Sequence, residues 1–287
     1  MKNNRWYIFA LLCVLFLAVS CVSAPVIEKP QYSQWHYKFS VLYDPDQPGV
    51  SPRLDMALSL LKTNYPEEQI KFLDDLLYFS LGIDDYKDKV VREQRENYRI
   101  KLSDSLASEQ DSEENGDGDE EGEQEQEFPD VPDWWYAERF FLSDPQPGGI
   151  IVERRIDTYS GGAHGFQARR YFVIDLEDQK LLKIDDFFQE YQGDETRELV
   201  YRELRKYSEL EDDQPLSQGI FMTDEPELSF NFFLTQEGLG LHWDPYEIAS
   251  YSEGSIEIIL PWKVIRPLML HSGMELLTKF GIFLFVG

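Results

Sequence analysis

IIVERRIDTYSGGAHGFQARRYFVIDLEDQKLLKIDDFF, residues 150–188, is the stretch that decides the fold. Every second position from Ile150 to Thr158 is apolar or β-branched, with Arg154 as the exception. A glycine-rich loop at 160–165 follows, and 171–184 holds two further strand-like runs separated by a short turn. Alternating runs joined by short, turn-forming loops are typical of neighbouring antiparallel strands. The stretch therefore predicts a meander of three strands.

The residues around this meander predict further strands and two helices. We expect a long helix over 195–210 capped by Asp194, because Val200, Leu204 and Tyr207 share one face. A short or kinked helix should follow Pro261. The remaining expected elements are strands, at 137–142, 228–235, 240–243, 255–260 and, as a buried strand, 280–286. Locally paired strands with separate helices predict an α+β fold, an antiparallel β-sheet with helices packed on one face.

The N-terminal half predicts a second, smaller unit. Residues 35–43 alternate as a strand does, whereas 54–61 places Leu54, Leu58 and Leu61 at helical spacing. Helical patterns continue to residue 102, so 35–102 is predicted as a small α+β domain preceding the main domain, 131–287. Between them, 103–130 is an acidic insert that we expect to be disordered, because such a composition cannot bury apolar surface.

The first residues are typical of a targeting signal. Lys2 and Arg5 precede an apolar run that ends in small residues before Cys21. This pattern resembles a bacterial lipoprotein signal peptide over 1–21, which implies that Cys21 becomes the acylated first residue of the mature chain. The alternative is a signal anchor that stays uncleaved. If Cys21 is acylated, residues 22–34 are a tether. The protein would then lie in the bacterial cell envelope, held at the membrane by its N-terminal lipid.

Charge and cysteine content exclude some classes of function. The formal net charge is −27, which argues against nucleic acid as a partner because phosphate backbones need a basic footprint. A cationic protein partner would fit this charge. Both cysteines, Cys13 and Cys21, lie in the signal segment, so the body of the chain can form neither a disulfide nor a thiolate metal site.

Two separated segments carry a resemblance to a known family. They are the YSGGAHG loop, residues 159–165, and DPYEIA, residues 244–249, supported by FNFFL at 230–234. Together they resemble the RsiV-like domain family, found in the extracellular part of the anti-sigma factor RsiV and in the peptidoglycan deacetylase PdaC. The resemblance covers about residues 135–270. It implies a binding domain whose partner is a protein, lysozyme in the case of RsiV, or a component of the cell wall.

The resemblance also implies where a partner would dock. Function is often housed in loops, and tyrosine and tryptophan are frequent interface anchors, so Trp243 is a further candidate. The residues that we assign to partner binding are Tyr159, Ser160, Gly161, Gly162, His164, Phe166, Pro245, Tyr246 and Tyr251.

Catalytic and metal-binding interpretations compete with this one. Ser160 and His164 could form a nucleophile and its base, and Asp157, His164 and His242 are candidate metal ligands. The simpler interpretation is that the loop glycines allow positive φ while His164 bonds a neighbouring carbonyl. We therefore expect no catalytic residue, no metal and no cofactor. The sequence predicts a lipid-anchored, extracytoplasmic, non-catalytic binding protein, with a cell-wall glycan hydrolase or a deacetylase-associated enzyme as the alternative.

Overall fold

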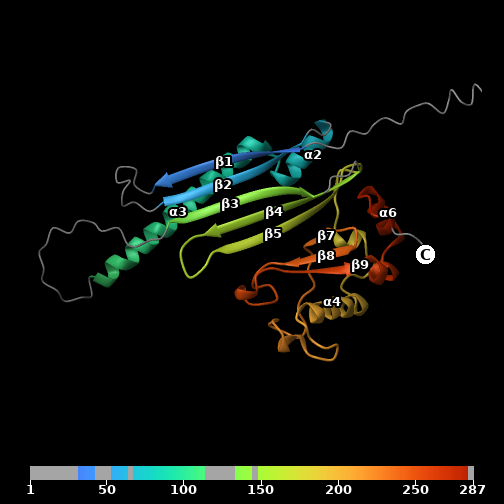
Figure 1. The fold of residues 1–287 in the computed structure, drawn as a ribbon. Helices are drawn as coiled ribbons and strands as arrows, with labels where there is room; N and C mark the ends of the chain where they lie inside the picture. The colour runs from blue at the N-terminus through green and yellow to red at the C-terminus, as the bar shows by residue number, and fades with distance from the viewer. Residues whose placement is uncertain (1–31, 43–52, 64–66, 114–132, 144–147, 284–287) are drawn as a thin grey trace, which may run out of the picture.

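The computed structural model describes residues 32–42, 53–63, 67–113, 133–143 and 148–283. The signal peptide, Cys21 and nearly all of the tether lie outside these residues. Within them the chain forms one six-stranded and one three-stranded sheet with accompanying helices (Figure 1). The predicted α+β class is confirmed.

The six-stranded sheet contains the predicted meander. Its strands lie in chain order, and every neighbouring pair is antiparallel except β2 with β3. The strands are β1 (Tyr32–Leu42), β2 (Arg53–Thr63), β3 (Trp134–Ser143), β4 (Gly149–Tyr159), β5 (Phe166–Asp175) and the two-residue β6 (Lys180–Leu181).

Strand β2 corrects one prediction. The helical spacing of Leu54, Leu58 and Leu61 is coincidental, since these residues lie in a strand. Leu54, Met56, Leu58 and Leu60 are all buried at 3% exposure or less, and alternate residues of a strand face the same side. Leu54 and Leu58 satisfy both periods over so short a run, and pairing with β1 and β3 decides between them.

The parallel pairing of β2 with β3 joins the two halves of the chain. Parallel neighbours need a long crossover, which here contains α2 (Glu67–Leu77) and α3 (Gly82–Glu113). The strands expected in a separate small domain therefore extend the sheet of the main domain. Helix α3 also continues past Ser103, so the expected disorder is wrong for 103–113, while 114–130 lies outside the described residues.

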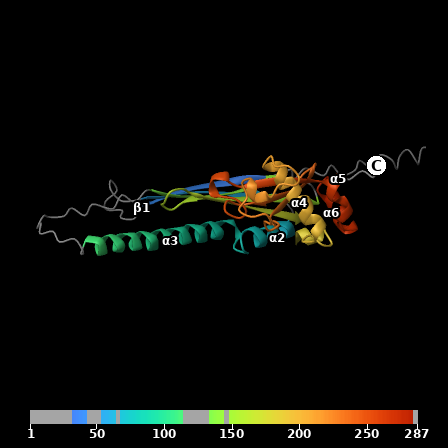
Figure 2. The ribbon, with the colours of Figure 1, turned by 90° about the horizontal axis from the view of Figure 1, so that it is seen from below.

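Helices α2 and α3 cover one face of this sheet, and α3 runs along it (Figure 2). The core between them contains Tyr78, Tyr86 and Tyr98 from the helical segment and, from the sheet, residues such as Phe140 and Ile174, each no more than 1% exposed. No helix among the described residues is long and apolar enough to cross a membrane.

A second layer packs on the opposite face, at β4 and β5. Ile151 and Val173 belong to this second core, whereas their neighbours Ile150 and Ile174 belong to the first. The layer is built from β7 (Phe232–Leu234), β8 (Gly238–Trp243) and β9 (Ile256–Pro261), with the helices α4 (Asp194–Tyr207), α5 (Trp262–Ile265) and α6 (His271–Lys279).

The main departures from prediction in this layer lie near helix ends. The helix expected after Asp194 is present, but Asp194 is its first residue and Gly193 is the N-cap. The helix after Pro261 is short, as expected. The buried strand expected at 280–286 is wrong for residues 280–283, which follow α6 as irregular chain, although Phe280 and Ile282 are buried as predicted.

Candidate functional site

The two loops assigned to partner binding meet in space. The β4–β5 loop, residues 160–165, lies against the segment after β8, residues 244–254. The rings of His164 and Tyr251 stack with centroids 3.7 Å apart and an interplanar angle of 14°. Tyr246 completes the group, with its hydroxyl 3.3 Å from His164 Nε2 and its ring centroid 5.6 Å from that of Tyr251. We call these three residues the aromatic cluster.

The glycines shape the first loop as the sequence predicts. Gly161 and Gly162 adopt φ of +84° and +94°, a region that side chains disfavour. The Tyr159 hydroxyl donates to the Gly162 carbonyl at 3.0 Å, and His164 Nδ1 lies 3.1 Å from the Gly165 carbonyl. The prediction that His164 bonds a neighbouring carbonyl is confirmed, and this contact orients the ring toward Tyr251.

Tyr246 is held in an unfavourable backbone conformation. Its φ is +73° and its side chain is 54% exposed, although no glycine or asparagine occupies the position. The surrounding turn maintains this geometry, because the Glu247 amide donates to the Asp244 carbonyl at 3.1 Å and the Asp244 amide donates to the Glu247 carboxylate at 2.7 Å. Strain held at an exposed aromatic residue is typical of functional positions.

A buried charged network anchors the second loop. The His242 side chain is fully buried, and its two ring nitrogens each lie 2.9 Å from a carboxylate oxygen, one of Asp244 and one of Glu257. Arg169 of β5 contributes twice: its amide donates to Asp244 at 2.8 Å and its guanidinium donates to Glu257 at 3.2 Å. The Tyr171 hydroxyl also donates to Glu257, at 3.1 Å. The network ties the base of the loop to β5 and β9.

The charges in this network stabilise one another. Burial alone would lower the pKa of His242, but its hydrogen bonds to Asp244 and Glu257 raise that pKa above its usual value. The pKa of Glu257 is lowered, chiefly by the hydrogen bond from His242. Because both ring nitrogens face acceptors, the ring fits this site as the imidazolium, which donates at both positions.

The assigned residues differ in exposure. Gly162, His164, Phe166 and Tyr246 are exposed, whereas Tyr159, Ser160, Gly161 and Tyr251 are partly exposed. Pro245 is buried, so it shapes the turn before Tyr246 and does not offer a contact surface. Trp243 is only 3% exposed and donates its indole N–H to the Glu227 carbonyl at 3.0 Å. The expectation of an exposed Trp243 is wrong, because β8 is buried along its whole length.

The candidate catalytic and metal-binding residues, Ser160, Asp157, His164 and His242, have other partners in the structure. Ser160 Oγ accepts a hydrogen bond from Lys101 at 3.4 Å, and Asp157 pairs with Arg139 at 2.6 Å. His242 is enclosed in its own network, apart from His164. Over the described parts of the chain, no group of three or more His, Cys, Asp or Glu side chains is arranged to hold a metal ion.

Sequence reasoning missed the supporting residues. Asn231 bridges to the edge of β5: its side-chain oxygen accepts from the Tyr171 amide at 2.9 Å and its side-chain nitrogen donates to the Arg169 carbonyl at 2.7 Å. In the sequence, the one available signal is that Asn231 interrupts the apolar run FNFFL. The role of Arg169 has no such signal, because its partners lie 75 and 88 positions away.

Comparison with known proteins links part of the chain, including the loop after β8, to a family of domains. Residues 185–263 match the family described as "Protein of unknown function (DUF3298)". This part of the chain thus resembles DUF3298 domains, and the predicted resemblance to RsiV-like domains is confirmed.

One curated relative is the peptidoglycan-N-acetylmuramic acid deacetylase PdaC of Bacillus subtilis. It is 29% identical over 115 residues, which make up 39% of this chain and 24% of PdaC. The chain thus spans about a quarter of the length of that relative. This match supports kinship of a domain and leaves the activity of the whole relative outside the comparison.

Two crystal structures of DUF3298 proteins share the fold. A Bacteroides fragilis protein superposes with a TM-score of 0.66 at 15% identity, covering 85% of this chain and 94% of its own. A Pseudomonas aeruginosa protein superposes with a TM-score of 0.51 at 16% identity, covering 84% of this chain and 96% of its own. At these identities the likeness concerns the fold alone. Both superpositions cover more of the chain than the 79 residues of the family match. This coverage is consistent with a single fold that includes the N-terminal strands.

Proposed function

We propose that this chain is a lipid-anchored, extracytoplasmic binding protein without catalytic activity, and that the aromatic cluster is where a cationic, lysozyme-like protein docks. The observation that carries the proposal is the stack of His164 on Tyr251, capped by Tyr246. Two loops about 80 residues apart present one exposed aromatic surface, supported from below by a buried charged network. Aromatic anchors on a rigid base are what protein interfaces use most.

Charge supports a cationic partner over a neutral one. The net charge of −27 would steer a basic protein toward the surface and raise the rate of encounter. Steering alone gives weak, salt-sensitive association, whereas a packed aromatic contact persists when charges are screened. The proposal therefore expects binding that weakens with salt without disappearing at about 200 mM, where the screening length is below 10 Å.

Calorimetric titration of a lysozyme into the purified protein tests this. Tyr246→Ala should weaken binding at least about tenfold, because truncating a central aromatic anchor costs more than about 1.4 kcal/mol. Tyr207→Ala is the matched control, since Tyr207 is 44% exposed on α4, away from the loops. Absence of binding in low salt, or equal loss in both variants, would contradict the proposal.

The lipid anchor and the enzyme alternative have their own tests. Cys21→Ser should release the protein from the membrane fraction, and retention of this variant at the membrane would contradict lipid anchoring through Cys21. The deacetylase named among the relatives raises the alternative of an enzyme that acts on peptidoglycan. Incubation of the protein with peptidoglycan fragments should leave their masses unchanged, and a change of mass would favour that alternative.

A further inference from the structure

One region of the six-stranded sheet offers an open surface distinct from the aromatic cluster. Helices α2 and α3 cover the face that carries Leu54, Met56 and Leu58. The residues between these, Asp55 and Ala57, point to the opposite face, because successive strand residues alternate. The three-stranded layer packs on that opposite face through residues of β4 and β5. Over β1 to β3 the face holds a shallow depression of about 370 Å³.

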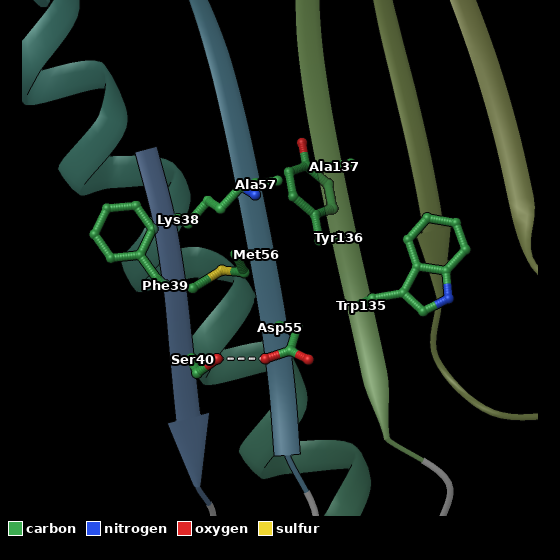
Figure 3. Close-up of a pocket in the computed structure, with 9 residues that line it drawn as sticks. All are labelled: Lys38, Phe39, Ser40, Asp55, Met56, Ala57, Trp135, Tyr136 and Ala137. Carbon is green, nitrogen blue, oxygen red and sulfur yellow. Dashed lines mark hydrogen bonds between the residues drawn. The ribbon is translucent and has the colours of Figure 1, made fainter. Parts of the chain in front are cut away.

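The depression exists because two alanines sit side by side. Ala57 of β2 pairs with Ala137 of β3, and Lys38 of β1 pairs with Ala57 on the other side. Two methyl groups leave a hollow among longer neighbours. In Figure 3 the Lys38 side chain extends from β1 and ends over β2 beside Ala57. The floor of the hollow is formed by the methyl groups of Ala57 and Ala137.

Trp135 borders this hollow with an open ring. It is 40% exposed, and in Figure 3 its indole lies over β4, seen nearly face-on. Toward the other side it approaches the β4–β5 loop: a methyl group placed on Gly165 would lie 3.7 Å from its Cζ2 atom. A large exposed indole lying flat on a sheet offers its π-face to a ligand, and buried packing does not account for it.

The polar groups around the ring carry charges of both signs. Asp55 accepts a hydrogen bond from Ser40 and pairs with Arg53 at 3.0 Å. On the β4 side, Arg139 pairs with Asp157 at 2.6 Å. Lys38 and Arg139 disfavour a cationic ligand on the ring, and the net charge of −27 disfavours a nucleotide base carried on phosphates. Balanced donors and acceptors beside an open aromatic face suit a neutral ligand with many hydroxyl groups.

We propose that this face is a saccharide-binding site. A saccharide chain crosses the strands, with one pyranose ring stacked on Trp135 and the hydroxyls of neighbouring units bonded to Asp55, Ser40 and Lys38. A small apolar substituent such as an acetamido methyl occupies the hollow over Ala57 and Ala137. An N-acetylated hexosamine chain combines these features. The site uses none of the residues of the aromatic cluster, so it goes beyond the protein partner proposed above, and either site can fail without the other.

The test is titration of the purified protein with the chitin tetrasaccharide, followed by NMR or calorimetry, with the matched glucose tetrasaccharide lacking acetamido groups alongside. Trp135→Ala should weaken binding of the chitin tetrasaccharide at least tenfold, and Ala57→Leu, which fills the hollow, should weaken it similarly. Tyr207→Ala, an exposed aromatic control, and His164→Ala should leave it unchanged. Ala57→Leu keeps the proposal testable if Trp135→Ala does not fold.

Several results would overturn the proposal. These are no binding of the chitin tetrasaccharide at millimolar concentration, binding that neither Trp135→Ala nor Ala57→Leu alters, or Trp135-dependent binding of a lysine-rich peptide in place of the sugar. Equal binding of both tetrasaccharides would overturn the assignment of the hollow to an acetamido group. Loss of lysozyme binding in His164→Ala with sugar binding intact would show that the two sites are separate.

Discussion

At the residue scale, His242 shows how a site of exposed rings is given a rigid base. Its ring is fully buried, and a buried charge is stable only when it is paired and hydrogen-bonded. Asp244, at the start of the loop, and Glu257, in β9, supply that pairing at 2.9 Å each. The loop that carries Tyr246 therefore begins at Asp244, and movement of Asp244 would leave the buried His242 charge without one of its two partners.

The pKa directions define the pH window in which this network stabilises the fold. Because the pKa of His242 is raised above its ordinary 6.5, its contribution is complete below pH 6.5 and is lost as pH rises through the raised value. Because the pKa of Glu257 is lowered below its ordinary 4.5, its contribution is present above pH 4.5 and is lost as pH falls through the lowered value. The two contributions overlap fully between pH 4.5 and 6.5.

Replacing His242 should therefore matter most in that window. His242→Gln should lower the free energy of unfolding by roughly 2 kcal/mol near pH 5.5, the scale of hydrogen bonds to charged groups. The difference from the natural protein should shrink at high pH as the histidine loses its proton. Urea unfolding of both proteins from pH 4 to pH 9 measures it, and a difference that grows steadily with pH would contradict the charged ring.

Two substitutions of Tyr246 distinguish its effect on stability from its effect on binding. Tyr246→Gly removes the ring and relieves the positive φ, whereas Tyr246→Ala removes the ring and keeps the strain. The glycine variant should be more stable than the alanine variant by about 1 kcal/mol, the usual cost of the left-handed region for a residue with a Cβ. Both should bind a lysozyme equally weakly. Equal stability of the two variants in urea unfolding would show that the backbone is not strained.

At the element scale, strand β4 contains a charge that the alternating pattern does not explain. Arg154 faces the same side as the buried Val152, because residues two apart in a strand share a face. On that side it reaches Glu138 of β3, whose side chain is fully buried. The Arg154 Nε lies 2.5 Å from the Glu138 carboxylate, which also accepts hydrogen bonds from Tyr86 and Tyr136. The exception in the sequence is thus one half of a buried ion pair that joins α3, β3 and β4.

Breaking this pair should be costly. Arg154→Met leaves Glu138 buried without its cation and should destabilise the protein by about 3–5 kcal/mol. The double variant Glu138→Leu/Arg154→Met should cost less than the single one, because no lone buried charge remains. Lys206→Met on α4, which breaks an exposed pair with Glu203, is the control and should cost below about 1 kcal/mol. Chemical unfolding compares all three, and a double variant less stable than Arg154→Met would contradict the coupling.

At the scale of the whole molecule, the N-terminal strands and the C-terminal domain share one sheet. β2 pairs with β3 over six positions, from Leu54 with Trp134 to Ser59 with Arg139. Tyr78 closes the same core from the helical side, with its hydroxyl hydrogen-bonded to both the amide and the carbonyl of Leu61 at 2.8 Å. The part of the chain after residue 131 therefore depends on residues 53–113 to cover one face of its sheet.

Removing the N-terminal half tests this dependence. Residues 131–287 alone would expose an apolar face that includes Trp134, Phe140, Ile150 and Val152, and contiguous apolar surface of that kind leads to association. We expect this fragment to aggregate or to unfold without a cooperative transition, whereas the full chain unfolds in one. A soluble monomeric fragment with a sharp thermal transition would show that the predicted domain boundary is a true one.

Several features could be predicted because they depend on neighbours in the sequence. The alternation in 150–158, the turn glycines at 161 and 162 and the apolar stripe of α4 are local, so the meander, its loop and the helix followed from them. The assignment of 54–61 failed because local patterns can be ambiguous: over eight residues the helical and strand periods share Leu54 and Leu58, and only pairing with β1 and β3 distinguishes the two structures.

The sequence by itself determined the α+β class, the strand order within the meander and two loops whose residues resemble a known family. Only the tertiary structure decided that those loops stack His164 on Tyr251, that Trp243 is buried and Trp135 exposed, and that His242 is clamped between two carboxylates. The physical reason is the sequence separation over which each interaction acts. Turns and periodicity act over a few residues, whereas ring stacking, burial and charge pairing depend on which distant segments the sheet brings together.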